Sequence, residues 1–484
     1  MNRREFLKMS GVAVVAATMG SKTVFGKSDI YKNTVGIPFK FPADLFTDVR
    51  IEDSFETAIL NRNGTLEQLC ERIYEGVFIR VFDGKRWYTS ATTDLAGIQG
   101  EIELLAKMAK PDPRISENPV VKAFQINTGN FIEFGDADVS KVSQKQKLAL
   151  IEQFVPTIKK SKLINDWSLI YKDKRRVKKI YSSKGTNLIF DFQTAGYAAS
   201  MTFVHKDKNF SERFDAAGNS FEELSKKADP KLLEEKMHLG EIFLKKAVPV
   251  TPGKYPVILS PAVAGVFAHE SFGHKSEADF MIGDEAMMKE WAIGKKVGAD
   301  ILSIVDDGNY PGTGFIRFDD EGNKSKEIYL IKNGILAGRL HSAKTAGMLG
   351  EITTGSSRAL DFSYEPVVRM TSTYIKPGTE TKEKLISEIK DGFLIDTLKH
   401  GSGMSTFTIA PSRSYRIRNG KIEEPVLISV ISGNVFETLN LVDGLSDVLE
   451  LQNPAIGGCG KLGQYPLPVN FGGPYVRVKT MDVR

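Results

Sequence analysis

Alternating hydrophobic and polar residues predict strands near the beginning of the chain. Residues 48–54 and 77–82 follow the two-residue period of a strand with one buried face. Between them, the apolar residues of 65–74 recur at helical spacing, so we expect a helix there with Cys70 as a core thiol. Residues 94–109 also have the pattern of an amphipathic helix. This part of the chain therefore predicts a mixed α/β region.

Longer helical and extended patterns follow and end at a group of helix-breaking residues. We expect a helix over 141–161, strands within 170–204, and a helix over 221–247 whose Lys- and Glu-rich face is solvated. The breaking residues are Pro249, Pro252, Gly253 and Pro256. This break predicts a domain boundary, with an N-terminal α/β domain over 27–247 and a β-rich domain over 248–484.

The second half of the chain has mostly strand patterns. Two of them end in Asn333-Gly334 and Asn419-Gly420, and Asn-Gly pairs favour tight hairpins because both residues tolerate a positive φ. The acidic residues 319–323 lack the spaced ligands of a calcium-binding loop, so we expect a solvated turn. The expected fold class is therefore α+β, with a mixed α/β N-terminal region and a β-rich C-terminal domain.

The first residues indicate export. Arg3-Arg4, an apolar run over 11–19 and a small residue at Gly26 resemble a twin-arginine signal peptide, residues 1–26, which directs a protein to the periplasm or another extracytoplasmic compartment. The apolar run is too short for a permanent membrane span. Hydrophobic residues make up 41% of the chain and charged residues 26%, as in globular proteins. The chain has a net charge of +5, and part of it comes from this segment. Such a small net charge gives no indication of nucleic-acid binding.

The candidate chemistry begins on a helix in the C-terminal half. A strand over 255–259 is followed by Ser260 as an N-cap and Pro261 at the first helical position. This helix carries His269-Glu270-Ser271-Phe272-Gly273-His274. A five-residue step separates two side chains of a regular α-helix by about 140°. Both histidines can bind one ion only if Gly273 ends the helix and lets His274 turn back, or if a π-type bulge realigns them.

Cys459 is the candidate third ligand, because it lies among glycines that permit tight turns rather than in an apolar run. Two imidazoles and one thiolate leave zinc one open position, which is the pattern of a catalytic site. The ion lowers the pKa of a bound water, and Glu270 is placed to accept its proton. Alternatively, Glu270 orients an imidazole, as Glu277 or Asp279 could orient His274. In an oxidising compartment, Cys459 could instead form a disulfide with Cys70.

These segments resemble motifs of a known protein family. The segment from His269 to Asp279 resembles the His-Glu-x-x-x-His motif of the TldD/PmbA metallopeptidases, and Cys459-Gly460-Lys461-x-Gly463-Gln464 resembles their C-terminal cysteine box. Residues 369–378 are similar to a third family segment, and 48–77 are similar in pattern. The glycine-rich stretch 401–405 is shorter than is usual in the family.

The resemblance implies a zinc metallopeptidase of the catalytic, TldD-like type. Zinc would be bound by His269, His274 and Cys459, and Glu270 would be essential for hydrolysis. The resemblance also implies a dimer, either a homodimer or a heterodimer with a related subunit. In such a dimer, unfolded or extended peptides would be cut inside an enclosed cavity. We expect such a peptide to add as a strand to an exposed sheet edge near the metal.

Two other functions are compatible with the sequence. The chain could be a metal-stabilised scaffold or partner subunit of a hetero-oligomeric protease, or it could hydrolyse a non-peptide amide. Glu270 argues against the scaffold, because a structural zinc site needs no carboxylate beside a ligand and usually has four protein ligands.

Overall fold

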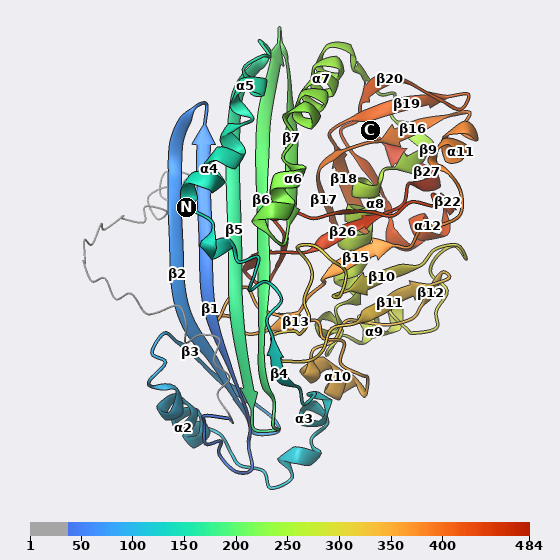
Figure 1. Cartoon of the computed structure of the whole chain (residues 1–484). Helices are drawn as coiled ribbons and strands as arrows, with labels where there is room; N and C mark the ends of the chain where they lie inside the picture. The colour runs from blue at the N-terminus through green and yellow to red at the C-terminus, as the bar shows by residue number, and fades with distance from the viewer. Residues whose placement is uncertain (1–36) are drawn as a thin grey trace, which may run out of the picture. The chain divides into compact units, whose positions relative to one another are not determined.

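The computed structural model describes residues 37–484, and residues 39–484 form one compact unit (Figure 1). The predicted signal peptide, residues 1–26, lies outside the described residues. The N-terminal half builds a seven-stranded sheet in the order β3-β2-β1-β5-β6-β4, and β7 also pairs with β6. Its strands are β1 (Phe46–Arg62), β2 (Thr65–Phe82), β3 (Trp87–Thr92), β4 (Thr128–Phe131), β5 (Ile164–Ser182), β6 (Asn187–His205) and β7 (Lys208–Gly218).

The predicted helix over 65–74 is wrong, because these residues form the first part of β2. They pair with Ser54–Arg62 of β1, and this pairing outweighs the local helical spacing of the apolar residues. The apolar side chains that suggested a buried helical face are exposed, Ile73 to 78%. Cys70 is only half-buried, so it is not the core thiol that the sequence predicts.

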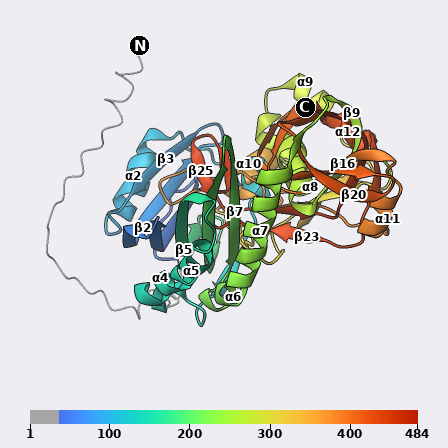
Figure 2. The ribbon, with the colours of Figure 1, turned by 90° about the horizontal axis from the view of Figure 1, so that it is seen from above.

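Four helices cover one face of this sheet. They are α4 (Gln144–Glu152), α5 (Val155–Ile158), α6 (Phe221–Lys227) and α7 (Pro230–Lys246), so each of the two predicted long helices is divided in two. Their apolar residues pack against odd-numbered residues of β5 and β6, such as Leu169 and Tyr197. Figure 2 shows α4, α5 and α6 grouped along one side of the long strands. Because side chains alternate along a strand, even-numbered residues of β5 face the opposite side.

Shorter elements complete the N-terminal half. The predicted helix over 94–109 is observed as α2 (Ile98–Met108). It is followed by 3₁₀ turns at Ile115–Glu117 and Val139–Lys141 and by α3 (Pro119–Ala123). Within residues 37–484, no helix combines the length and apolar character needed to cross a membrane.

Two larger sheets build the C-terminal half. A ten-stranded sheet runs β17-β18-β21-β27-β9-β16-β19-β20-β8, with β22 beside β27, and a six-stranded sheet runs β12-β11-β10-β15-β26-β23. The strands of the first are β8 (Val248–Pro249), β9 (Gly253–Leu259), β16 (Asp391–Ile395), β17 (Leu398–Gly403), β18 (Thr406–Pro411), β19 (Ser414–Arg418), β20 (Lys421–Leu427), β21 (Ile431–Asn434), β22 (Val442–Leu445) and β27 (Val476–Val483). Those of the second are β10 (Ile304–Asp307), β11 (Glu327–Lys332), β12 (Ile335–Leu336), β15 (Ser372–Ile375), β23 (Glu450–Gln452) and β26 (Asn470–Gly473).

Two small hairpins and several short helices connect these sheets. The strand pairs are β13 (Ser357–Arg358) with β14 (Val367–Val368), and β24 (Cys459–Lys461) with β25 (Gln464–Leu467). The helices are α9 (Glu285–Glu290), α10 (Ala343–Leu349), α11 (Lys382–Ser387) and α12 (Val435–Asn440). The expected α+β class with a β-rich C-terminal half is thus confirmed.

Both Asn-Gly hairpins form where the sequence predicts them. Asn333 and Gly334 join β11 to β12 with φ values of 50° and 76°, and Asn419 and Gly420 join β19 to β20 with φ values of 46° and 75°. Two consecutive positive φ angles match the right-handed twist of the flanking strands. These turns were predictable because two adjacent residues determine them.

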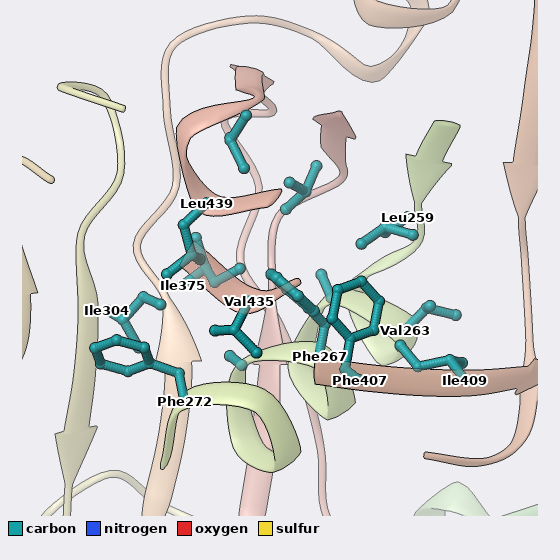
Figure 3. Close-up of a cluster of buried hydrophobic side chains, with 14 of the residues drawn as sticks. Leu259, Val263, Phe267, Phe272, Ile304, Ile375, Phe407, Ile409, Val435 and Leu439 are labelled. Carbon is teal, nitrogen blue, oxygen red and sulfur yellow. The ribbon is translucent and has the colours of Figure 1, made fainter. Parts of the chain in front are cut away.

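Helix α8 (Pro261–Ala268) lies in the core of the C-terminal half, where it packs against β26, β15 and β23. As predicted, the Ser260 side chain caps it by accepting a hydrogen bond from the Val263 amide, and Pro261 occupies the first turn. Figure 3 shows the surrounding apolar core, labelled at Leu259, Val263, Phe267, Phe272, Ile304, Ile375, Phe407, Ile409, Val435 and Leu439. The histidine motif therefore starts from a tightly packed helix.

The acidic segment 319–323 contradicts the predicted solvated turn, because all five of its residues are buried. Arg80 of β2 donates a hydrogen bond to Glu321 over 3.1 Å, and Lys178 of β5 pairs with Asp320. These cations come from strands far away in the sequence, so local spacing could not reveal them. The turn thereby fixes the C-terminal half against the N-terminal sheet.

Candidate metal centre

The histidine motif continues α8 as one π-helical turn, His269–Gly273, followed by a 3₁₀ turn, His274–Ser276. The wider π turn brings the two imidazoles together, with ring centroids 5.2 Å apart. Of the two predicted routes, the structure therefore selects the π-type irregularity. Gly273 does not end the helix but permits close packing, because a Cβ atom there would overlap the Met370 sulfur.

Cys459 joins the two histidines. Potential ligand atoms of His269, His274 and Cys459 all lie within 4.8 Å of one another, and Cys459 Sγ lies 3.4 Å from His274 Nε2. Cys459 belongs to the hairpin formed by β24 and β25. The fully buried Arg369 holds this hairpin by donating to the Cys459 carbonyl over 2.8 Å. Arg369 begins the third family-like segment, so the structure gives that segment a positioning role.

The electrostatics of this cluster favour the thiolate form of Cys459. Burial alone would raise the pKa of Cys459, but His269 and His274 lower it to about 4. Burial alone would lower the pKa of His274, but hydrogen bonds to Cys459 and Glu277 raise it to about 10. The buried His269 Nδ1 has no hydrogen-bond partner within residues 37–484. A thiolate and two imidazoles are a donor set that fits zinc.

Glu277 and Lys461 determine the orientation of His274. The Glu277 carboxylate lies 3.1 Å from His274 Nδ1, which leaves Nε2 directed at Cys459. Lys461 Nζ donates to Glu277 over 3.0 Å and to Asp279 over 2.6 Å. Burial raises the pKa of Glu277, but His274 and Lys461 lower it overall. Of the two candidate orienting acids, Glu277 thus contacts the imidazole, whereas Asp279 contacts Lys461 of the cysteine box. The sequence pattern did not predict this role of Lys461.

Glu270 lies apart from the three potential ligands and lines a neighbouring cavity of about 850 Å³. Strand β17, at one end of the ten-stranded sheet, forms another wall through His400 and Gly401. A Cβ atom at Gly401 would lie 2.5 Å from Val266, and one at Gly403 would lie 3.2 Å from the Glu270 carbonyl oxygen. Glycines therefore allow β17 to approach the π turn, which explains the glycine-rich stretch.

The remaining cysteine and histidines lie outside this cluster. Cys70 and Cys459 are both free, so the structure contains no disulfide between them. His341 is buried and contacts Thr345 and Glu351, as expected of an ordinary core histidine. His400 lines the cavity beside Glu270, a position that its place in the sequence did not indicate.

Comparison with protein families identifies two matching regions. Residues 252–484 match the PmbA/TldA metallopeptidase C-terminal domain, and residues 47–109 match the PmbA/TldA metallopeptidase domain 1. A metalloprotease of Methanocaldococcus jannaschii is 30% identical over 442 residues, which cover 89% of this chain and 95% of that protein. A zinc metalloprotease TldD homolog of Saccharolobus solfataricus is 29% identical over 450 residues, covering 90% of this chain and 96% of that protein.

Solved structures share the fold. TldE of Thermococcus kodakarensis superimposes with a TM-score of 0.70 at 16% identity, covering 90% of this chain and 96% of its own. A putative modulator of a DNA gyrase from Thermotoga maritima gives a TM-score of 0.73 at 19% identity, covering 91% of this chain and 96% of its own. At these identities, the likeness concerns the fold alone.

Proposed function

The chain belongs to the TldD/PmbA metallopeptidase family, and from this premise we propose that it is a zinc peptidase that hydrolyses unfolded or extended peptides. The observation that carries the proposal is the group formed by His269, His274 and Cys459, with Glu270 on the adjoining cavity wall. Three protein ligands leave one coordination position open, as catalytic zinc sites require. A scaffold subunit would need neither the open position nor the carboxylate.

The roles of the side chains follow from their positions. When bound, zinc would supply Lewis-acid chemistry that polarises water and the scissile carbonyl. Glu270 would accept a proton from the attacking water at its carboxylate and pass it to the leaving amine. Glu277 would hold His274 with Nε2 towards the centre, because its carboxylate faces Nδ1.

The cavity suits an extended peptide. Within the described residues, β17 pairs with β18 on one side only, so its other edge offers free main-chain groups beside Glu270. A peptide that adds as a strand is recognised mainly through its backbone. We therefore expect broad side-chain preference, and we expect folded proteins to resist cleavage. Hydrolysis of a non-peptide amide would not need this edge.

Replacing Glu270 with Gln tests the catalytic assignment. E270Q should lose cleavage of an unfolded, fluorescently labelled protein while keeping about one zinc ion per chain, because it removes the base but no ligand. The exposed Glu285, exchanged for Gln, is the matched control and should retain both properties. Activity is followed by fluorescence and zinc by mass spectrometry. Substantial residual cleavage by E270Q would refute the role of Glu270.

We also propose that the enzyme is exported and works as a dimer. Twin-arginine export would place it outside the cytoplasm after folding, and Arg3 and Arg4 are the supporting residues.

For a dimer, the support is the edge of β2 over 65–76, which within residues 37–484 pairs only with β1 and exposes Leu66, Leu69 and Ile73. Such edges readily pair with another chain, and a second copy would offer the same edge in antiparallel orientation.

A further inference from the structure

A second cavity, of about 580 Å³, lies on the face of the N-terminal sheet opposite helices α4 to α7. Four cationic residues of β5 alternate along this face: Lys172, Lys174, Arg176 and Lys178. Arg72 of β2 and Arg358 of β13 also line the cavity. One wall of the cavity is therefore strongly basic.

The cations of this wall are incompletely neutralised. Lys174 pairs with Glu56 over 2.5 Å, and Lys178 pairs with Asp320. Arg72 and Lys172 have no ion-pair partner within residues 37–484. The carboxylates of Glu56, Asp319, Asp320 and Asp361 also line the cavity, so the unpaired positive charge lies at Arg72 and Lys172 rather than along the whole face.

Arg176 is the most unusual of these residues. Its side chain is only 4% exposed, yet it makes no hydrogen bond within the described residues. The nearest carboxylate oxygen belongs to Glu52 at 3.8 Å, and Glu52 also lies 3.1 Å from Arg50 and 4.0 Å from Lys178. A buried guanidinium without hydrogen bonds is costly, and its planar donors match a carboxylate. Arg176 therefore offers a prepared contact for an anion.

This cavity borders the proposed active site. Ala455 and Gly457 line the basic cavity, whereas Pro454, Ile456 and Gly458 line the cavity beside Glu270. The segment that separates the two cavities leads directly into Cys459. It is fixed on β6, because a Cβ atom at Gly196 would overlap the Ala455 side chain. A peptide bound beside Glu270 would therefore have to pass over this segment to reach the basic cavity.

We propose that the basic cavity is a subsite for a carboxylate of the peptide, with Arg176 as its anchor. The inference rests on the proposed peptidase function and adds a preference to it. The carboxylate could be the peptide's C-terminus or an Asp or Glu side chain, because both present the same group to a guanidinium. Inorganic phosphate would fill the site less well, since it provides no main chain to reach β17.

Peptide binding to the zinc-loaded E270Q protein tests this subsite without turnover. Fluorescence anisotropy would compare peptides of one length: neutral with an amidated C-terminus, neutral with a free C-terminus, and Glu-containing with an amidated C-terminus. We expect at least one carboxylate peptide to bind about tenfold tighter than the neutral amide, a difference of about 1.4 kcal/mol. The peptide that binds tighter identifies the source of the carboxylate.

Three further exchanges in the same background assign the preference to Arg176. Arg176→Gln should abolish it, and Arg176→Lys should keep part of it, because the charge remains. Lys179→Gln, on the opposite face of the same strand, should retain it fully. Thermal unfolding confirms that each variant is folded, and if Arg176→Gln does not fold, the comparison of Arg176→Lys with Lys179→Gln decides.

Two results would overturn the inference: equal affinity for all three peptides, or a preference that persists in Arg176→Gln. Cleavage of the neutral amidated peptide by the unmodified enzyme is measured separately. Cleavage without carboxylate preference would contradict the subsite alone, whereas no cleavage of any peptide would contradict the proposed function.

Discussion

At the residue scale, two of the three potential ligands of the metal centre, His274 and Cys459, are held by neighbours of complementary chemistry. Glu277 faces His274 Nδ1, Lys461 holds Glu277, and Arg369 holds the backbone of Cys459. These contacts fix the direction in which the donor atoms point before any ion binds. Such preorganisation raises metal affinity, because less freedom is lost on binding.

Exchange of Glu277 for Gln should weaken zinc binding by about 10- to 100-fold, because the amide no longer provides the charge that holds His274 Nδ1–H. Competition with a chromogenic chelator measures this affinity. Asp279→Asn is the matched control, since Asp279 contacts Lys461 rather than the imidazole, and its effect should be smaller. Equal zinc affinity in the Glu277 variant and the unmodified protein would show that Glu277 does not position the ligand.

At the element scale, the five-residue π turn brings together the two histidines of the six-residue motif. Local signals predicted much of this element: Ser260 and Pro261 start the helix, and the histidine spacing requires an irregular turn. Residues 77–82 of β2 were predicted as a strand, but the first part of β2, residues 65–74, was not, because pairing with β1 outweighs the helical spacing of its apolar residues. The position of Cys459 beside the histidines also depends on contacts between distant segments, such as that with Arg369.

Gly273→Ala should disrupt the π turn, because its Cβ atom would overlap the Met370 sulfur. We expect the free energy of unfolding to fall by about 1 to 3 kcal/mol, as for other overpacked cores, with loss of zinc. Urea unfolding measures the stability, and a further Met370→Ala exchange should restore part of the loss. Gly100→Ala is the control, since its Cβ atom would meet no other atom within 4 Å. A stable, zinc-loaded Gly273→Ala variant would contradict this account of the turn.

At the scale of the whole molecule, buried ion pairs join the C-terminal half to the N-terminal sheet. Asp320 lies between Lys178 and Arg50, and Glu321 contacts Arg80. The acidic residues were visible in the sequence, but their burial was not, because their partners lie on strands more than a hundred residues earlier. The same sheet also carries both cavities, so its placement determines the shape of the site.

The pKa of Asp320 gives a pH-dependent prediction. Burial alone would raise it, but Lys178 and Arg50 lower it from 3.8 to about 2. A lowered pKa in the folded protein means that this carboxylate stabilises the fold above about pH 4 and that the contribution is lost as the pH falls towards 2. Asp320→Asn should therefore lower the free energy of unfolding by about 3 to 5 kcal/mol at neutral pH, because it leaves buried cations unpaired.

Urea unfolding of Asp320→Asn and the unmodified protein between pH 2 and 7 measures this difference in stability. The difference should shrink as the pH falls from 4 to 2, since protonated Asp320 resembles Asn. An undiminished difference at the lowest pH at which both proteins fold would contradict the assigned pKa.

Binding of one zinc ion by His269, His274 and Cys459 is the claim that X-ray absorption at the zinc edge would test without reference to activity. The purified protein should show one sulfur at about 2.3 Å and two imidazole nitrogens at about 2.0 to 2.1 Å from the metal. Cys459→Ser should remove the sulfur signal, whereas Cys70→Ser should leave it unchanged. A zinc-loaded, active protein without a sulfur neighbour would contradict the claim, as would one in which Cys459 is linked to Cys70.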